Sequence, residues 1–430
     1  MLNRWMKSLI AVAALGLALP LVANAQTSRV EGMSVQGDYI KDYTAIYTYS
    51  SEISHVGNLV YGEFGSTEAA ATPVDDRAVG AVLGNLFDGR FGTWGIHLRE
   101  WTPNLGQGDI TSNPGVGAGG QDPNANNNHS FDLMWGKRMG GTSLGLRLNR
   151  SVFETKLSVP PATTTITTLA GGDNFNRNVW GFGAGVGFEV NPTSSFEASL
   201  IWQNRTFENS TTPIVGTNTT EDSPTTYQFA ARLLWQYQPN LLVVPVFKWY
   251  SFDLSTKSTT AAASTTANNT LKGWQIGAAG NWTLNQNDLF VLGLTFAHNS
   301  VEQDVPIFGS GIVGAAADNS KIDESIYPQV FAALETHVNS WLTLRFGANQ
   351  DVYAKIKTTP RTPATDNAAE QTFSRFDMHL GAGVKVGNLQ FDAIVANDFF
   401  QNLGWLGSGN SSDATTTGAY FPKVTATYAF

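Results

Sequence analysis

The sequence predicts an all-β fold, a transmembrane antiparallel up-and-down β-barrel of about 16 strands with short periplasmic turns and long extracellular loops. Large apolar residues alternate with small or polar ones at a period of two, and short connections alternate with long ones. Charged residues are only 14% of the 430 residues, while aromatic residues reach 11%. Soluble domains average about 25% charged residues, so this composition suits a chain that faces both lipid and water.

Residues 1–25 are predicted to be a secretory signal peptide. Arg4 and Lys7 precede an apolar run from Leu9 to Val22, and Ala23-Asn24-Ala25 forms a small-x-small cleavage site. The run is shorter than the roughly 20 residues of a membrane-spanning helix, which makes a membrane anchor the less favoured interpretation. The sequence that follows contains no long apolar stretch, so any insertion into a membrane must use strands.

Residues 26–54 are expected to form an N-terminal periplasmic segment or a small plug. The stretch Asp42-Tyr43-Thr44-Ala45-Ile46-Tyr47, followed by Ser50-Ser51-Glu52-Ile53, resembles the N-terminal segment of the fatty-acid-transporter-like barrels. In that family a comparable Ala-Ile-Tyr stretch usually runs into Asn-Pro-Ala, which this chain lacks. The resemblance implies a plug, uptake of a hydrophobic compound and a barrel of about 14 strands, which is the alternative strand count.

Residues 55–430 are predicted to be the barrel itself. Between Val179 and Val190 the large apolar residues occupy one parity and glycines occupy most of the other, which is typical of a strand. The alternation recurs in Tyr227–Tyr237, Gly273–Trp282 and Phe376–Val386. We expect strands to start near His55, Arg77, Phe91, His129, Thr142, Asn178, Ser194, Thr225, Leu241, Leu271, Asp288, Asp323, Trp341, Ser374, Leu389 and Ala419.

The connections between these strands alternate in length. Tight turns are expected at Asp88-Gly89-Arg90, Met139-Gly140-Gly141, Asn191-Pro192-Thr193, Gln238-Pro239-Asn240, Asn285-Gln286-Asn287, Val338-Asn339-Ser340 and Gly387-Asn388. Long polar loops are expected at 65–76, 103–128, 156–177, 209–224, 257–269, 304–322, 358–372 and 403–418. Strict alternation places the tight turns at one end of the barrel and the long loops at the other.

A soluble β-sandwich is the alternative fold, because its strands would also alternate. Its packed inner face would be rich in Val, Leu and Ile. Here the alternate positions that do not carry the large apolar residues are mainly Gly, Gln, Asn, Asp and Arg. Pro245, Pro328 and Pro422 fall within proposed strands. Proline has no backbone N–H to donate, and a closed barrel has no edge strand at which this donor is not needed. We expect bulges or rim positions to accommodate them.

The C-terminus carries a candidate assembly signal. The pattern Lys423-x-Thr425-x-x-Tyr428-x-Phe430 resembles the insertion signal of Gram-negative bacterial outer-membrane barrels, with Thr425 at the position usually held by Gly. The resemblance implies location in the outer membrane, surrounding outer-membrane lipid, and the barrel-assembly machinery as a partner.

Several function classes are excluded or disfavoured. The chain has no cysteine, and its six histidines form no metal-binding or catalytic motif, so we expect no metal, no cofactor and no enzymatic activity. A net charge of -9 and a pI near 5.2 argue against nucleic acid as a partner.

Charged residues on the inward parity are the pore-lining candidates. One wall carries arginines: Arg99, Arg138, Arg147, Arg205 and Arg232. The opposite wall carries carboxylates: Glu335, Asp377, Asp392 and Asp398. We expect a transverse field that orients dipolar solutes. In the alternative interpretation the lumen charges are mixed and paired locally, because this segregation is broken by Glu189, Glu197, Arg345, Lys385 and Lys423.

The predicted function is passive diffusion of small hydrophilic solutes through a porin-like, water-filled channel, because sixteen strands enclose an aqueous lumen. Two alternatives remain: uptake of a hydrophobic compound past an N-terminal plug, and a structural or surface-displayed barrel. An apolar stretch on the inward parity would favour hydrophobic uptake, and the sequence pattern shows none. The solute and the choice between a monomer and a homo-oligomer stay open.

Overall fold

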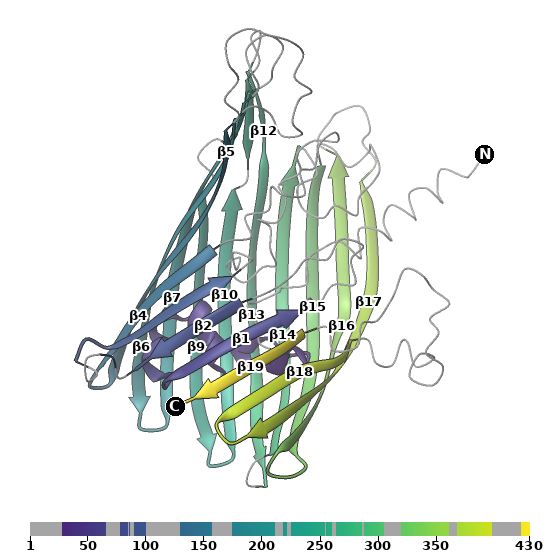
Figure 1. Cartoon of the computed structure of the whole chain (residues 1–430). Coiled ribbons are helices and arrows are strands. Elements are labelled where there is room, and N and C mark those ends of the chain that lie inside the picture. Colours follow the sequence, from purple (N-terminus) through teal and green to yellow (C-terminus); the bar gives the residue numbers. More distant parts are fainter. Residues whose placement is uncertain are drawn as a thin grey trace, which may run out of the picture.

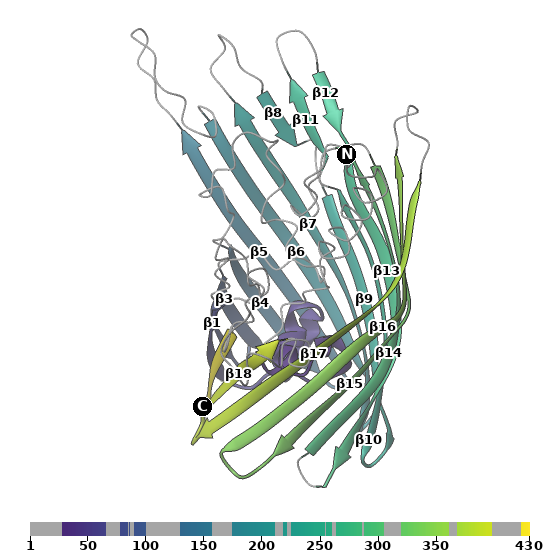
Figure 2. The ribbon, with the colours of Figure 1, turned by 90° about the vertical axis from the view of Figure 1, so that its right-hand side faces the viewer.

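The computed structural model describes residues 28–65, 78–84, 86, 90–99, 130–156, 174–210, 218–221, 225–253, 255–259, 264–285, 288–304, 320–360, 368–397 and 423–430. Within these ranges the strands form one antiparallel sheet that closes on itself as a barrel (Figures 1 and 2). Closure is made by the first and last strands, with Leu59 opposite Ala429 and Gly65 opposite Lys423.

Sixteen strands in the described part of the chain form the barrel wall. They are β1 (Leu59–Gly65), β2 (Ala78–Leu83), β3 (Thr93–Arg99), β4 (Ser130–Met139), β5 (Thr142–Lys156), β6 (Asn174–Asn191), β7 (Ser194–Ser210), β9 (Thr225–Gln238), β10 (Leu241–Asp253), β13 (Asn269–Leu284), β14 (Asp288–Gln303), β15 (Ser320–His337), β16 (Leu342–Pro360), β17 (Ala369–Val386), β18 (Leu389–Asn397) and β19 (Lys423–Ala429). The predicted sixteen-stranded antiparallel barrel is confirmed, and the alternative count of fourteen is wrong.

Strand boundaries differ from the prediction mainly near the long connections. The first strand begins at Leu59 rather than at His55, because His55 ends a short helix. Three further short strands, β8 (Asn218–Glu221), β11 (Thr256–Thr259) and β12 (Ser264–Ala267), lie in stretches predicted to be loops. They extend the sheet beyond the barrel wall, with β11 pairing to both β8 and β12. Their threonines explain the error, because β-branched residues favour extended backbone.

The outer face of the barrel is apolar and the inner face is polar. Trp180 and Phe182 of β6 are 49% and 47% exposed, while polar side chains such as Arg232 and Gln275 are 1% exposed. A soluble β-protein has its apolar side chains inside and its polar side chains outside. The opposite distribution here is typical of a barrel whose outside faces lipid. The exposed aromatic residues near the tight turns include Phe188, Trp235, Tyr237, Trp341, Tyr428 and Phe430.

The tight turns lie at one end of the barrel (Figure 1). Gly140 and Gly387 each adopt a φ of 62°, a left-handed conformation that favours glycine in a two-residue hairpin. Of the predicted turns, Asp88-Gly89-Arg90 and Asn285-Gln286-Asn287 fall only partly within the described residues.

Two of the three prolines coincide with irregular pairing. Thr295 pairs with Gln329 and Ala297 with Ile326, so that Pro328 lies in a β-bulge between β14 and β15. On β10, Pro245 pairs with Ala278 of β13, and the ladder to β9 has no partner for it. These irregularities free both positions from donating a ladder hydrogen bond. Pro422 lies outside the described residues.

An N-terminal segment lies inside the barrel, toward the end that carries the tight turns (Figures 1 and 2). It comprises α2 (Ser28–Glu31) and three short 3-10 helices, η1 (Gly37–Tyr39), η2 (Tyr43–Tyr47) and η3 (Ser50–His55). We call residues 28–56 the plug. Asp42 caps η2 by accepting a hydrogen bond from the Thr44 backbone N–H at 3.0 Å. No helix among the described residues has the length and apolar character needed to span a membrane.

The plug has its own apolar contacts with the wall. Val30, Met33 and Tyr39 pack into a buried cluster with Val246 of β10 and Phe331 of β15. A second cluster joins plug and wall on the other side of the barrel; its members include Ile46, Ile53, Tyr61, Val82 and Met134. Two buried apolar clusters of this molecule therefore lie at the boundary between plug and barrel.

Candidate functional site

The plug hydrogen-bonds to strands around the circumference of the barrel. On one side, Ser28 contacts Thr425 of β19 at 2.9 Å, and on another Ser34 accepts a bond from Asn349 of β16 at 2.7 Å. Further contacts are made by Tyr39 with Thr295 of β14, by Thr48 with Ser199 of β7 and by Tyr47 with Tyr61 of β1. These strands are distributed around the whole sheet, so the plug crosses the lumen from wall to wall.

Inward-facing glycines create the space in which the plug backbone docks. A Cβ atom at Gly145 of β5 would overlap the Ser50 carbonyl group, and a Cβ atom at Gly347 of β16 would overlap the Met33 carbonyl group. Gly185 of β6 approaches the backbone of Ser50 and Ser51 in the same way. The glycines that alternate with large apolar residues in these strands therefore allow the plug backbone to lie close to the wall.

The first charged cluster fixes the start of the plug. Arg29 pairs with Asp42 and with Glu335 of β15, both at 2.9 Å. Glu335 also accepts a bond from Arg345 of β16 at 2.6 Å, and Arg345 reaches Asp392 of β18 at 2.8 Å. The Glu335 hydrogen bonds and the nearby carboxylates outweigh the opposing effect of burial and raise the pKa of Arg29. The guanidinium of the plug is thus part of a charge network that continues through three strands.

A separate pair joins the plug to the closing strand. Lys423 of β19 contacts Glu31 of the plug at 2.9 Å and Glu63 of β1 at 2.8 Å. Both contacts are shielded from solvent, since the Lys423 side chain is only 3% exposed. This lysine therefore joins the two strands of the barrel seam to the plug.

The second charged cluster lies on β7 and β9. Arg232 contacts Glu197 at 2.7 Å and Glu52 of the plug at 3.6 Å, and its guanidinium lies 4.4 Å from the centre of the Tyr49 ring. Burial disfavours ionisation of Glu52, but a hydrogen bond with His55 and the Arg232 charge outweigh it and lower the pKa of Glu52 to about 2. The same hydrogen bond raises the pKa of His55 above 6.5.

A third cluster lies on β3 to β5. Arg147 pairs with Asp132 at 2.8 Å and donates a hydrogen bond to the Tyr47 carbonyl oxygen of the plug at 2.9 Å. The Tyr47 hydroxyl in turn hydrogen-bonds to His97 of β3. Arg147, Asp132 and His97 are all buried. Each of the three clusters therefore combines charges of neighbouring strands with a plug residue.

Four of the pore-lining candidates lie in the charged clusters. Arg147, Arg232, Glu335 and Asp392 face inward and are buried in the clusters above. Their ion pairs link nearby strands and the plug, as in the interpretation of locally paired charges; one of them, between Arg345 and Asp392, spans β17. Asp377 is half-buried on β17, and Arg138 is exposed near a tight turn, where it pairs with Glu189. The side chains of Arg99 and Arg205 and the whole of Asp398 lie outside the described residues, and the role of the set in lining a pore stays a prediction.

The candidate assembly signal divides between the two faces of β19. Lys423 and Thr425 point inward and bond to the plug, whereas Tyr428 and Phe430 are 47% and 57% exposed on the outside. Thr425 stands where such signals usually have Gly, and its hydroxyl contacts Ser28. The role of these four residues in assembly stays a prediction.

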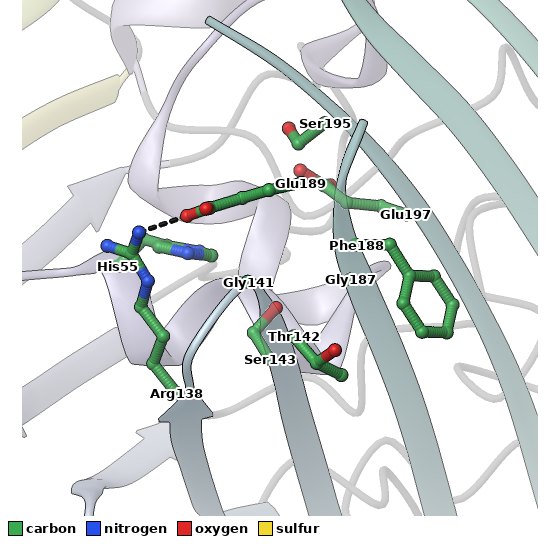
Figure 3. Close-up of a pocket in the computed structure, with 10 residues that line it drawn as sticks. All are labelled: His55, Arg138, Gly141, Thr142, Ser143, Gly187, Phe188, Glu189, Ser195 and Glu197. Carbon is green, nitrogen blue, oxygen red and sulfur yellow. Dashed lines mark hydrogen bonds and ion pairs between the residues drawn. The ribbon is translucent and has the colours of Figure 1, made fainter. Parts of the chain in front are cut away.

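A small pocket opens between the end of the plug and the tight turns (Figure 3). His55, Arg138, Ser143, Glu189 and Glu197 are among the residues that line it, and Arg138 pairs with Glu189. Its volume is about 20 Å³, which holds about one water molecule. It is therefore too small to bind a solute. Among the residues that the structure describes, no cluster of histidines and carboxylates is arranged to hold a metal ion.

The wall toward the long connections carries an apolar cluster that the sequence pattern did not reveal. Its buried members are Ile201, Tyr250, Phe252, Leu271, Val301, Ile322 and Ile356, with Phe373 packed against them. Four of them lie opposite one another in adjacent strands: Phe252 of β10 pairs with Leu271 of β13, Leu271 with Val301 of β14, and Val301 with Ile322 of β15. We call Phe252, Leu271, Val301 and Ile322 the apolar row.

The apolar row is separate from the plug. Phe252 follows Val246, which packs against the plug, by six residues on β10, or about 20 Å along the strand. All four residues have the inward parity, because Leu271 and Phe252 are buried while their outward neighbour Trp249 is exposed. Each strand contributes a single residue to the row, so the row becomes visible only when the strand register is known.

The chain is similar in fold to several solved structures. No protein-family model and no curated protein matches the sequence. A FadL homologue of Pseudomonas aeruginosa is 11% identical, with a TM-score of 0.43 and coverage of 96% of this chain and 100% of the other. The toluene transporters TbuX of Ralstonia pickettii and TodX of Pseudomonas putida are 10% and 9% identical, with TM-scores of 0.36 and 0.39. They cover 94% and 95% of this chain, and 97% and 98% of their own.

At these identities and scores the likenesses assign no function to this chain. Its own geometry gives the structural conclusion: the chain is a closed sixteen-stranded transmembrane β-barrel whose N-terminal plug crosses the lumen and whose inner wall beyond the plug carries an apolar row.

Proposed function

We propose that the protein is an outer-membrane channel for uptake of a hydrophobic compound past its N-terminal plug. The observation that carries this proposal is the apolar row, which faces the lumen on the side of the plug where the long connections lie. Inward apolar side chains lower the free energy of a hydrophobic compound relative to water, by about 25 cal/mol for each Å² of apolar surface removed from water. A water-filled path for hydrophilic solutes gains no such stabilisation from apolar side chains.

Passive diffusion of small hydrophilic solutes, which the sequence predicted, is not supported. That prediction assumed an unobstructed aqueous lumen, whereas plug residues bond to strands on every side of the barrel. Burial of charges in plug contacts also removes them from a water-filled path. The physical reason for the error is that the interior of a sixteen-stranded barrel is wide enough to hold a folded segment of the same chain.

The same proposal covers location and partners. Export by the N-terminal signal sequence and insertion into outer-membrane lipid by the barrel-assembly machinery would bring the chain to the outer membrane. The apolar outer face with exposed aromatic residues near the tight turns supports a lipid environment. Transport rather than catalysis is the proposed role.

Binding of naphthalene, a neutral apolar probe, tests the proposal. The purified barrel in lipid nanodiscs should bind naphthalene saturably in equilibrium dialysis, above the partitioning into empty nanodiscs. Phe252→Ala should weaken binding about tenfold, because an aromatic contact in the apolar row is lost. Phe247→Ala is the matched control, since Phe247 lies on the same strand and is 39% exposed on the outside.

Conductance provides the second measurement. The wild-type barrel should show little steady conductance in a planar bilayer, because the plug crosses the lumen. A large ohmic conductance without naphthalene binding would contradict the proposal and restore the hydrophilic channel. Absence of both would favour the structural or surface-displayed barrel.

A further inference from the structure

A second register row lies next to the apolar row, on the side toward the plug, and it contains polar side chains. Ile201 of β7 pairs with Gln228 of β9, and Gln228 pairs with Tyr250 of β10. The row continues through Gly273 of β13 and Asn299 of β14 to Glu324 of β15. Tyr250 and Ile201 also belong to the apolar cluster, so polar and apolar side chains share one inner surface.

Part of this polar row is internally satisfied. The Tyr250 ring lies across Gly273, where a Cβ atom would collide with it, and the Tyr250 hydroxyl donates to Oδ1 of Asn299. The Asn299 amide then donates to Oε2 of Glu324 at 3.0 Å. A chain of two hydrogen bonds therefore holds the Glu324 carboxylate against the inner wall.

Two buried side chains of the row retain unused hydrogen-bonding capacity. Gln228 is 1% exposed, and neither its Nε2 nor its Oε1 bonds to any residue that the structure describes. Glu324 is 6% exposed, forms no ion pair with a described residue, and bonds to them only through Oε2. Buried polar groups are costly unless they are bonded, and a buried carboxylate costs most.

Neighbouring inward charges do not neutralise Glu324 by direct contact. Lys248 of β10 pairs with Asp38 of the plug, and Arg375 of β17 pairs with Asp351 of β16 at 2.7 Å. Both cations are therefore engaged by other carboxylates, and neither forms an ion pair with Glu324. A bound group that donates a hydrogen bond would stabilise this carboxylate, whereas a second carboxylate would be repelled.

We infer that the inner wall above the plug binds apolar molecules that carry a hydrogen-bond donor, an ammonium or a hydroxyl group, and that it rejects carboxylates. The apolar row contacts the body of the molecule, while Glu324 and Gln228 receive its donor group. This inference rests on the proposed function, since it names the class of compound that the apolar row takes.

A matched series of four benzyl compounds tests the inference. Benzylamine, benzyl alcohol, toluene and benzoate share one ring and differ in the group that meets the wall. Equilibrium dialysis against the wild-type barrel in nanodiscs, with empty nanodiscs subtracted, should show benzylamine or benzyl alcohol binding more tightly than toluene, and benzoate binding least. The first two compounds distinguish a charged donor from a neutral one.

The variant Glu324→Gln should weaken binding of the preferred donor compound by about tenfold, as expected for loss of a hydrogen bond to a charged group. It should leave toluene unchanged and improve benzoate. Asp323→Asn is the control, because Asp323 is the adjacent carboxylate on the opposite face of β15, where it pairs with Lys321. Gln228→Leu should weaken the same donor compound while leaving toluene unchanged.

The outcomes separate the two proposals. Equal binding of all four compounds, or tightest binding of benzoate, overturns the donor inference and leaves the proposed function standing. If Glu324→Gln binds the preferred donor compound as tightly as the wild type does, the donor inference is likewise overturned and the proposed function still stands. If naphthalene binds and none of the four compounds does, the donor inference fails alone. If neither naphthalene nor any of the four compounds binds above empty nanodiscs, the proposed function itself fails, and the inference fails with it.

Discussion

Arg29 of the plug and Glu335 of β15 meet in a two-point contact, although they are 306 residues apart in the chain. The Nε and Nη2 atoms of Arg29 each donate to a different carboxylate oxygen at 2.9 Å. Such fork-shaped pairs are stronger and more directional than single charge contacts. Because Glu335 is also bound to Arg345, this contact couples the position of the plug to the charge network of the wall.

Replacing Arg29 should loosen the plug. In Arg29→Gln the fork and its charge are lost, and Glu335 keeps only Arg345 as a cationic partner. Loss of one partner from a buried ion pair costs about 3–5 kcal/mol, and we expect about 1–2 kcal/mol here because Arg29 is 21% exposed. Planar-bilayer recordings should therefore show more frequent open events than in the wild type.

The control for this variant is Arg138→Gln. Arg138 also pairs with a glutamate, but its side chain is 54% exposed and its ionic partner is Glu189 of the wall rather than a plug residue. Its recordings should match the wild type. Identical recordings from both variants would show that the Arg29 contact does not hold the plug in place.

Enlarging a docking glycine should displace the plug without unfolding the wall. Gly145→Ala places a methyl group where the Ser50 carbonyl lies, whereas the outward side chains of β5 keep their lipid contacts. We expect a folded, heat-modifiable barrel in which the N-terminal segment is cleaved by trypsin at Arg29 or Lys41 more readily than in the wild type. Gly57→Ala should behave as wild type, because a Cβ there meets nothing within 4 Å.

The stability of η3 should depend on pH through His55 and Glu52, which pair with each other within this helix. The pKa of His55 is raised by its contact with Glu52, so its contribution is complete below 6.5 and is lost as pH rises through the raised pKa. The pKa of Glu52 is lowered to about 2, so its contribution is present above 4.5 and is lost as pH falls through 2. The contact is therefore strongest between pH 4.5 and 6.5.

Hydrogen exchange at the backbone amides of residues 50–56 measures this dependence, after correction for the intrinsic effect of pH on exchange. Protection should fall between pH 6 and pH 9 in the wild type. His55→Gln should lack this fall, because glutamine does not titrate. The same pH dependence in the variant would assign the effect to another group, such as Glu197 or Arg138, which also act on His55.

The C-terminal residue should matter for assembly more than for the finished fold. Phe430 is 57% exposed at the outer rim, and its backbone N–H donates to the Asn58 carbonyl at 3.2 Å. Phe430→Asp would keep that bond, while the aromatic group expected to be read during insertion is lost. We expect a several-fold lower yield of heat-modifiable barrel. Asn388→Asp, which adds a charge at an exposed tight turn beside β19, should give the wild-type yield; equal yields from both variants would remove the assembly role of Phe430.

The barrel could be predicted because its signals are local. Period-two alternation and the alternation of short and long connections can be read without knowing which strands pair, and strands such as β5 and β7 begin at the expected residues Thr142 and Ser194. Where a connection is rich in threonine, as around β11, extended backbone could not be distinguished from a loop by composition alone. The pairing of β11 with two other short strands decides it.

The site was harder to predict because it depends on register and on the third dimension. Arg147 and Arg232 could be identified as inward residues, but their partners Asp132 and Glu197 lie on other strands and their plug contacts lie 100 or more residues away. The apolar row contains one residue per strand, so no single strand shows it. Gln228 and Glu324 belong to the same row only through the pairing of five strands.

The contact between Ser28 and Thr425 spans 397 residues and has a consequence for biosynthesis. The plug is translated before the barrel strands, but Ser28 finds this partner only when β19 has been made. Until then, Glu31 and Glu63 lack Lys423, and the seam between β1 and β19 is open. A chain released before residue 423 would therefore expose both an unpaired strand edge and a half-docked N-terminus, which gives a quality-control protease two places at which to recognise an unfinished barrel.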